Sequence, residues 1–538
     1  MNKGPSTSRR IGKGTKENTI AYTKTPTGDT YQTKQIPFVY KWDSREPFES
    51  APGNLPYDAI SSNVVFEPVS SQTTGEKIYN AYKRDGTTHL TWALATPPNP
   101  VHHDFSENVE GIWYNSASGY TIVLTINAGG TLTSYYVLGG LATGQPVDIA
   151  AQHLGALVQV FDNPINWTDY VYDSGEIAVF LSTPNHTGVE KIKLSGGFAN
   201  SAITPAIGVH NGDPTTLDGY LFLSTPNGNI YNSNLNDPAT WGASNFITAE
   251  SFGDGLKRIA RSGPYIVAFG TDSIEWFYDA ANPTGSPLSV YTGATKRVGL
   301  LGGVAAVGDT LYFVGKTPQA AASLYKIEGL KLEQVADFTM SRQFGTNYRD
   351  SFEQATGNFV SYNGHTVYVW WSATDDAFPI CYDLDTKMFV SLDFKQGDLD
   401  IIQSTSIPFE AGYYSSAFCR TADSRVYYFD PSVYQDDLVD FTAYLQTKNE
   451  DFGTRRLKFG SRALLNCDQT DASSNCQLSW TVDDYKTWST TRTVDLESVY
   501  PASHALGQFR KIAFKLTYTD NFPMRFNAIE LDYNLGGA

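Results

Sequence analysis

Residues Gly263–Tyr278 read GPYIVAFGTDSIEWFY. A turn opens the segment, an uninterrupted apolar stretch follows, and a second turn leads into another apolar and aromatic stretch. An apolar run of this length without polar alternation is typical of a strand that is buried on both faces. The segment therefore predicts two short strands joined by a turn.

Segments of the same kind recur along the chain. Successive starts lie roughly 40 to 60 residues apart, close to the roughly 40–50 residues of a four-stranded propeller blade. The self-similarity is clearest in LSTPN, which occurs at Leu181 and at Leu223. The other segments are SGYTIVLTI from Ser118, GEIAVFLSTPN from Gly175, DGYLFLSTPNGNIY from Asp218, GDTLYFVG from Gly308, NGHTVYVWW from Asn363 and DSRVYYFD from Asp423.

This repeat predicts a mainly β chain containing a β-propeller of about six or seven blades with inserted loops. One four-stranded sheet cannot bury both of its faces alone, whereas radial stacking of blades buries them and leaves only short edges. Two helices are expected as insertions, one over Asp148–Phe161, where Asp148 is a candidate N-cap, and one within Phe338–Gln354.

The chain divides into four expected parts. Residues 1–35 are polar and predict an extended N-terminal arm, and residues 36–110 predict an irregular β segment. Residues 111–440 carry the repeat and predict the propeller. Residues 441–538 contain alternating strands with ordinary turns and predict a C-terminal β-sandwich-like module.

Composition limits the classes of function. The 538 residues are 41% hydrophobic and 18% charged, which indicates a globular chain, and the net charge is −17. Proteins that grip phosphate are usually basic, so tight nucleic-acid binding is not expected. We expect no membrane segment, because no apolar run approaches the roughly 20 residues a spanning helix needs, and no signal peptide.

The four cysteines do not predict a disulfide framework. Cys381 and Cys419 are isolated in sequence. Cys467 and Cys476 could face each other across a hairpin. Free core thiols are favoured, and a bridge or a metal pair is left open.

Acidic and basic candidates for catalysis give no distinct pattern. Asp483 and Asp484 are adjacent and would point to opposite faces of a strand, so turn residues are the favoured interpretation. Arg455 and Arg456 lack the third arginine expected of a sialidase. The stretch TVDDYKTW (Thr481–Trp488) resembles a structural Asp-box hairpin, although Tyr485 replaces the glycine and should restrict positive φ there.

Metal and cofactor motifs are equally weak. His102 and His103 adjoin Asp104, but neighbouring histidines on an extended chain do not easily bind one ion. Nucleophile-elbow, Walker A and Cys–His signatures are missing from the sequence. We therefore expect no enzyme and name no catalytic, cofactor-binding or metal-binding residue.

A more specific pattern runs from Ser233 to about Arg342. Its parts are SNLNDPATW (Ser233–Trp241), ITAESFGDGLKRI (Ile247–Ile259), YIVAFGTDSIEWFYDAANPTGSPL (Tyr265–Leu288) and KRVGLLGGVAAVGDTLYFVGKTPQAAASLYKIEGLKLEQV (Lys296–Val335). This order resembles the packaged-DNA stabilisation, or tail nozzle, proteins of short-tailed bacteriophages. The segment around Trp480–Ser489 resembles them more loosely, and GGVAAVGD (Gly302–Asp309) and QVADFTMSR (Gln334–Arg342) depart from the family pattern.

The resemblance implies a structural protein of the phage virion. It implies a homohexameric ring below the head-to-tail adaptor protein, with a tail needle or plug and tail fibres or spikes as neighbours. The ring would retain packaged double-stranded DNA and conduct it during ejection without sequence-specific binding. The alternative is a carbohydrate-binding or depolymerising β-propeller tail protein, for which Trp370 and Trp371 are the aromatic candidates, and a third possibility is a generic interaction module.

Overall fold

The structure is a computed structural model of the chain, divided into two compact units. One unit is the propeller, Arg84–Phe441 with Trp42–Glu46, and the other comprises Met1–Lys41, Pro47–Lys83 and Thr442–Ala538. The residues described are 22–24, 30–37, 61–69, 78–94, 101–102, 104–127, 132–141, 148–161, 164–249, 251–317, 320–336, 338–347, 352, 355–362, 364–371, 380–392, 401–408, 414–420, 423–447, 449–470 and 472–536.

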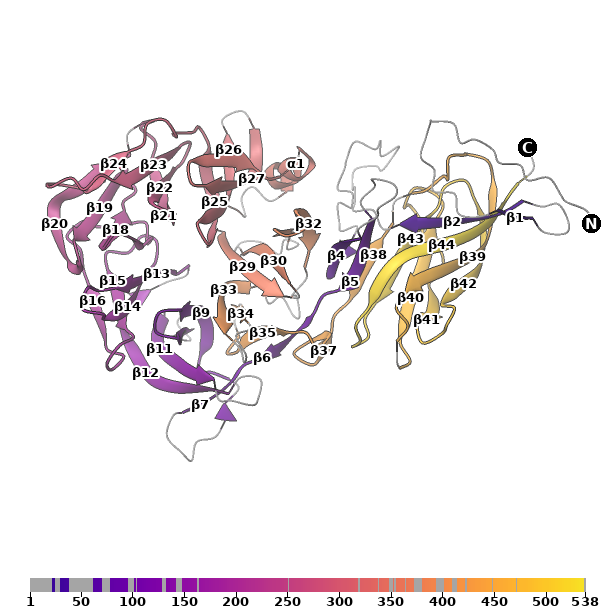
Figure 1. Ribbon diagram of the computed structural model, residues 1–538, viewed down its shortest axis with the longest axis horizontal. Helices are drawn as coiled ribbons and strands as arrows, with labels where there is room; N and C mark the ends of the chain where they lie inside the picture. The colour runs from indigo at the N-terminus through magenta and orange to yellow at the C-terminus, as the bar shows by residue number, and fades with distance from the viewer. Residues whose placement is uncertain are drawn as a thin grey trace, which may run out of the picture. The chain divides into compact units, whose positions relative to one another are not determined.

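Seven sheets, here blades 1 to 7, follow one another in chain order around a common centre (Figure 1). Blade 1 has β9 (Asn108–Asn115), β10 (Tyr120–Ile126), β11 (Leu132–Leu141) and β12 (Asp148–Phe161), extended by β7 (Thr91–Leu94) and β8 (Val101–His102). Blade 2 has β13 (Asn166–Val171), β14 (Ile177–Ser182), β15 (Val189–Lys193) and β16 (Asn200–Ile203). Blade 3 has β17 (Thr215–Leu217), β18 (Tyr220–Ser224), β19 (Asn229–Asn234) and β20 (Asp237–Thr248).

The next three blades repeat the four-stranded antiparallel pattern. Blade 4 has β21 (Leu256–Ser262), β22 (Tyr265–Gly270), β23 (Ile274–Asp279) and β24 (Leu288–Val290). Blade 5 has β25 (Gly299–Val307), β26 (Thr310–Thr317), β27 (Ala320–Glu328) and β28 (Lys331–Gln334). Blade 6 has β29 (Thr356–Tyr362), β30 (His365–Trp371), β31 (Ile380–Asp383) and β32 (Met388–Ser391).

The hairpin predicted from Gly263–Tyr278 is confirmed as β22 and β23 of blade 4. The two strands pair antiparallel, with Tyr265 opposite Tyr278. Alternate β22 side chains enter different cores: Ile266 and Ala268 pack toward blade 3, whereas Val267 and Phe269 pack toward blade 5. Both faces of the strand are therefore buried, which is why its sequence shows no polar alternation.

Blade 7 closes the ring with a strand from the other end of the propeller sequence. It contains β33 (Ile401–Pro408), β34 (Tyr414–Arg420) and β35 (Val426–Asp430), and β35 pairs antiparallel with β6 (Gly86–His89). The short strands β36 (Gln435–Asp436) and β37 (Val439–Asp440) complete the sheet. Pairing between the first and last strands ties the ends of the propeller together.

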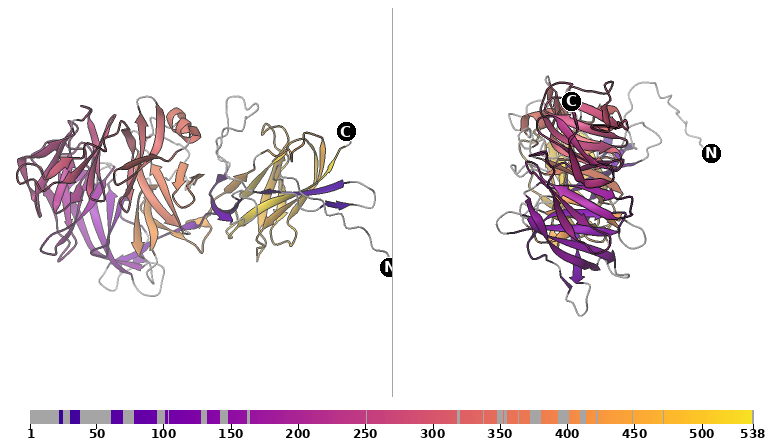
Figure 2. Two further views of the ribbon diagram at one scale, coloured as in Figure 1. Left: turned by 45° about the horizontal axis from the view of Figure 1, so that its top comes forward. Right: turned by 90° about the vertical axis from the view of Figure 1, so that its left-hand side faces the viewer.

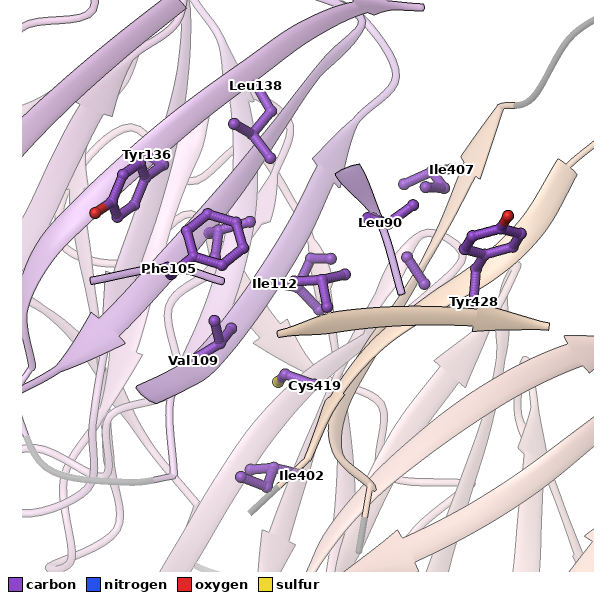
Figure 3. Close-up of a cluster of buried hydrophobic side chains, with 13 residues drawn as sticks. Leu90, Phe105, Val109, Ile112, Tyr136, Leu138, Ile402, Ile407, Cys419 and Tyr428 are labelled. Atoms are coloured by element: carbon purple, nitrogen blue, oxygen red, sulfur yellow. The ribbon is translucent and has the colours of Figure 1, made fainter. Parts of the chain in front are cut away.

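A single apolar core joins blade 7 to blade 1 (Figure 3). Val109, Ile112 and Val123 from blade 1 are fully buried, as are Ala417 and Cys419 from blade 7. At about 25 cal/mol per Å² of buried apolar surface, such a core is the main favourable contribution to closing the ring.

Buried polar contacts fix β6 within blade 7. The Arg84 guanidinium forms a fully buried ion pair with Asp436, and Asp436 also accepts a hydrogen bond from Thr87 Oγ1 at 3.1 Å. The Arg420 guanidinium donates to the same Thr87 oxygen at 3.1 Å. Removing one partner of a buried pair leaves an uncompensated charge, so this network strongly disfavours opening of the closure.

The two predicted helices have different outcomes. The helix expected within Phe338–Gln354 is confirmed as α1 (Phe338–Asn347). The helix expected over Asp148–Phe161 was wrong, because this segment is β12, paired along its length with β11. Side chains such as Leu154 and Val158 are exposed in the part of β12 beyond Asp148–Ala151, the residues that pair with β7, so the apolar spacing that suggested a helix belongs to a strand that is exposed on alternate residues.

The second unit is a β-sandwich built from both ends of the chain. One sheet contains β1 (Tyr22–Lys24), β2 (Thr30–Pro37), β4 (Val64–Val69), β5 (Ile78–Lys83), β39 (Lys458–Cys467), β42 (Ala502–Phe509) and β44 (Arg525–Leu535). The other contains β3 (Ser61–Ser62), β38 (Ala443–Gln446), β40 (Asn475–Thr481), β41 (Arg492–Asp495) and β43 (Ala513–Tyr518). Figure 2 shows β2, in indigo, beside β44, in yellow.

The structure divides the chain differently from the four expected parts. Within residues 1–35, β1 and most of β2 belong to the sandwich, because β2 pairs with β44 from Tyr31 to Pro37. The expected segment 36–110 is shared between the two units, and the propeller begins at Arg84 instead of residue 111. The boundary after Phe441 lies one residue from the expected one.

The closure at β6 predicts a large effect of Gly86→Ala. A Cβ at this buried position would overlap the backbone oxygen of Gln435 and lie 2.6 Å from its nitrogen. Backbone cannot move aside as a side chain can, so we expect a loss of about 1–3 kcal/mol of stability. The measurement is the urea midpoint of the propeller transition, followed by tryptophan fluorescence.

Gly293→Ala is the matched control, because its Cβ would meet only a ring carbon of Tyr291 at 3.5 Å. The Gly293→Ala midpoint should stay within error of the parent protein. Equal midpoints for the two variants would contradict closure through β6.

Candidate functional site

The candidate site is a cavity on the axis of the propeller. It has a volume of about 600 Å³, and the first strands of all seven blades contribute to its wall. Those first strands contact one another from blade to blade, from β13 through β33 and on to β9. Pockets of this size and position commonly receive small molecules.

Four charged residues line the cavity, and the remaining wall is neutral. Glu110 comes from β9, Asp213 from the residues before β17, and Arg258 and Arg261 from β21. The rest of the wall contains threonine, serine and asparagine side chains together with apolar ones such as Val304. The cavity therefore carries two acids and two bases.

Asp213 links blades 3 and 4. Its carboxylate accepts hydrogen bonds from the Ser224 backbone N–H at 3.0 Å, the Ser224 hydroxyl at 2.5 Å and the Ile259 N–H at 2.6 Å. Burial raises the pKa of Asp213 to about 6, although these hydrogen bonds and nearby Arg258 favour its ionised form. The carboxylate has a structural task and is already committed to protein donors.

Arg258 and Trp167 carry donors that have no acceptor in the described part of the chain. The Arg258 Nε and the Trp167 Nε1 are both buried atoms on side chains that line the cavity. The Trp167 indole stacks on Trp113 with ring centroids 6.1 Å apart. Trp113 differs, because its own Nε1 donates to Asp169 at 2.8 Å.

The two adjacent acids Asp483 and Asp484 lie in the turn after β40, as expected. The Asp483 carboxylate accepts hydrogen bonds from the Thr487 hydroxyl at 2.5 Å, the Thr487 N–H at 3.0 Å and the Thr481 hydroxyl at 2.8 Å. These bonds lower the pKa of Asp483 to about 2. The carboxylate organises a hairpin, as the resemblance to an Asp-box predicts.

The expected restriction at Tyr485 is not seen in the backbone. Asp484 and Tyr485 both adopt positive φ, 57° and 65°. The Tyr485 hydroxyl donates to the Thr447 carbonyl at 3.1 Å, and its ring lies 6.1 Å from that of Trp488. These contacts hold a side chain in a conformation that usually favours glycine.

The four cysteines are free thiols, and all but Cys467 are buried. Cys467 ends β39 and Cys476 lies in β40, which belong to different sheets of the sandwich. They therefore do not face each other across a hairpin. Burial raises the pKa of Cys467 to about 11 and that of Cys476 further, so both are protonated near neutral pH.

The other candidates from the sequence are dispersed. Asp104 forms an ion pair with Arg425. His103 lies outside the described residues, as do the side chains of His102 and Trp371. Trp370 packs on Phe352 with ring centroids 4.5 Å apart. Arg455 and Arg456 are exposed in the sandwich, and Arg456 donates to the Gly536 carbonyl at 2.9 Å.

A cluster that sequence reasoning missed joins His365, Asp383 and Asp385 in blade 6. The His365 Nδ1 lies 2.8 Å from Asp383, which also accepts hydrogen bonds from the Thr386 hydroxyl and the Asp385 N–H. Burial opposes ionisation, but the bonds from His365 and Thr386 outweigh it and lower the pKa of Asp383. The group fixes the β31–β32 turn, and the turn sequence DLDTK (Asp383–Lys387) was its only signal.

Fold and cavity together define a closed seven-bladed β-propeller accompanied by a β-sandwich. Residues 171–370 match the family model of phage stabilisation proteins described as the β-propeller of bacteriophage P22 Gp10. The segment Ser233–Arg342 lies inside this range, so the resemblance to that family is confirmed. The family forms part of the virion tail, which confirms the phage virion as the location and indicates a structural tail protein.

Other comparisons add little. No curated protein matches the chain. A solved streptogramin B lyase is 13% identical, with a TM-score of 0.37, over 64% of this chain and 97% of that one. The N-terminal domain of Nup159 is 9% identical, with a TM-score of 0.36, and the match covers 69% of this chain and 99% of that domain. Similarities this low carry no functional argument.

The buried Asp213 predicts a pH-dependent contribution to stability. Its folded pKa of about 6 exceeds the ordinary 3.8, so the folded state binds the proton more tightly. The contribution to the free energy of unfolding is therefore present below pH 4 and is lost as pH rises to 6, by about 3 kcal/mol at most. Thermal unfolding between pH 4 and 7 should show Asp213→Asn losing this dependence.

Asp218→Asn, at an exposed turn in the same blade, is the control and should keep the parent profile. A constant difference in melting temperature between the parent and Asp213→Asn across this pH range would contradict the raised pKa.

Proposed function

We propose that this chain forms the tail nozzle ring of a short-tailed phage, which retains packaged DNA and conducts it during ejection. The match of residues 171–370 to the phage stabilisation family carries this proposal. The role is mechanical, and the chain acts without catalysis.

The closed propeller suits a part that bears pressure. Every blade is packed on two neighbours, and the closing strand β6 is held by backbone pairing and by the buried Arg84–Asp436 ion pair. A close-packed interior has low compressibility and transmits strain. A ring of such units resists deformation by confined DNA without a moving part in each unit.

The charge of the chain suits a wall along which DNA slides. With 39 basic and 56 acidic residues, the chain offers few sites for lasting ion pairs with phosphate. A neutral or acidic surface repels the polymer at close range and keeps it mobile. The DNA passes without sequence-specific binding.

The proposed assembly has six copies and several neighbours. Heterologous contacts that close after a rotation generate a ring, and a hexamer is the state implied by the family resemblance. The head-to-tail adaptor protein lies above the ring. A tail needle or plug and tail fibres or spikes complete the set of partners.

The carbohydrate-active alternative has no supporting observation among the described residues. A glycosidase needs two carboxylates free to act on the bond. Asp213, an acid of the axial cavity, already accepts three protein hydrogen bonds, and Trp370 is packed on Phe352.

The proposed hexameric assembly is tested by measuring the molar mass of the particle and by imaging it. We expect light scattering and negative-stain microscopy to show a six-fold ring, either alone or after the adaptor protein is added, because ring contacts between copies must close. A chain that stays monomeric with the adaptor, or that cleaves capsular polysaccharide with ordinary turnover, would contradict the nozzle proposal.

The conduit role predicts weak binding of duplex DNA. Fluorescence anisotropy with a labelled 30-base-pair duplex should give no saturable binding at micromolar protein, because few phosphates are neutralised. The apparent affinity should change little between 50 and 200 mM salt. A steep loss of affinity over that range would indicate many phosphate contacts and would overturn the low-friction argument.

A further inference from the structure

Three metal-ligating side chains meet in blade 6: His365, Asp383 and Asp385. Their ligand atoms, one imidazole nitrogen and two carboxylate oxygens, all lie within 4.8 Å of one another. An ion bonded to two ligands at about 2.1 Å holds those ligands no more than about 4.2 Å apart. A small rotation of the exposed Asp385 side chain is therefore enough to bring the three atoms into one coordination shell.

The pairing of β30 with β31 explains why these side chains meet. Asp383 lies opposite Val367 in the register of the two strands. His365 precedes Val367 by two residues, so its side chain lies on the same face of the sheet as that of Asp383. The His365 Nδ1 and the Asp383 carboxylate are 2.8 Å apart as a result.

Both carboxylates are oriented by hydrogen bonds from the protein. Asp383 is 1% exposed and accepts from the Thr386 hydroxyl at 2.7 Å and from the Asp385 N–H at 2.9 Å. Asp385 accepts from the Thr366 N–H at 2.6 Å through one oxygen, and no donor among the described residues reaches its other oxygen. Hydrogen bonds of this kind orient ligating carboxylates around a metal ion.

A further buried carboxylate near this cluster has no hydrogen-bond partner. Asp85 is 4% exposed, and within the described residues its side chain accepts no hydrogen bond and forms no ion pair. It interacts electrostatically with Arg84 and with His365, but Arg84 is already paired with Asp436. A buried carboxylate destabilises the folded state unless a positive charge lies close to it.

The Tyr362 hydroxyl is a second buried group without a partner on this face of blade 6. Tyr362 is 3% exposed and lies directly opposite His365 in the β29–β30 hairpin, so the two side chains share a face. Its hydroxyl has no hydrogen-bond partner in the described part of the chain, and it interacts electrostatically with Asp383 and Asp85. An unsatisfied oxygen and an unpaired acid therefore lie within electrostatic range of the His365–Asp383 pair.

We propose that His365, Asp383 and Asp385 bind one divalent first-row transition ion of the Zn²⁺ or Mn²⁺ class. An imidazole ligand favours these ions over Ca²⁺ and Mg²⁺, which prefer oxygen ligands alone. The ion replaces the hydrogen bond between His365 Nδ1 and Asp383, so the imidazole binds with that nitrogen unprotonated. Water completes the coordination on the side of the exposed Asp385.

The bound ion joins β30 to the β31–β32 turn and offsets buried negative charge in blade 6. This site is independent of the nozzle proposal, since ring assembly and ion binding are measured separately.

The test is calorimetric titration of the full chain at pH 7 after removal of metal with EDTA and dialysis. ZnCl₂, MnCl₂ and CaCl₂ are the separate probes. We expect one saturable site per chain for Zn²⁺ or Mn²⁺, and no saturable binding of Ca²⁺ up to about 1 mM. Binding of only one of the two transition ions supports the site and identifies its preference. No saturable binding of either, or tighter binding of Ca²⁺ than of both, overturns the proposal.

Variants locate the site. Asp385→Asn keeps the shape of an exposed side chain and an acceptor for the Thr366 N–H, and it should weaken ion binding at least about tenfold. His365→Gln removes the nitrogen ligand and should have an effect of at least the same size. Asp218→Asn removes an equal charge from an exposed turn in blade 3 and should stay within twofold of the parent protein. Unchanged affinity in Asp385→Asn overturns the three-ligand site.

A structural readout covers the case in which His365→Gln fails to fold. Anomalous diffraction from crystals of the parent protein soaked in the bound ion should place the ion within about 2.3 Å of His365 Nδ1 and of an oxygen from each of Asp383 and Asp385. An ion found only at other places overturns the assignment.

Discussion

Burial of both faces of each blade is the constraint on which the propeller depends. In β22, Ile266 and Ala268 face blade 3 while Val267 and Phe269 face blade 5, so one strand contributes to two cores. A blade that lacked a neighbour on one side would expose the apolar face on that side to water. The ring must therefore close, and β6 and the core between blades 7 and 1 complete it.

The sequence predicts the repeated elements well because their apolar strands have the same cause in each blade. It predicts the exceptions poorly. The segment Asp148–Phe161 looks helical because its apolar residues lie three and four apart, but pairing with β11 overrides that local pattern. The polar strand β2 carries little apolar signal, and only its partner β44, from the opposite end of the chain, makes it part of a sheet.

The candidate site was invisible in the sequence for a different reason. Asp213, Arg258 and Trp167 come from three blades and carry no fixed spacing, because only the ring brings first strands together at the axis. The turn residues Asp483 and Asp484 were predictable, since a turn is a local structure. The cysteines were predictable as free thiols but not as members of opposite sheets, which depends on the whole sandwich.

The pairing of early strands with late ones also orders events during synthesis. Strand β6 leaves the ribosome long before its partner β35, and β2 precedes β44, which ends close to the C-terminus. Neither unit can finish folding until most or all of the chain has been translated, and unpaired edges must stay out of aggregates meanwhile. A product truncated before β44 lacks a complete sandwich, so the topology itself separates chains that contain β44 from those that do not before assembly.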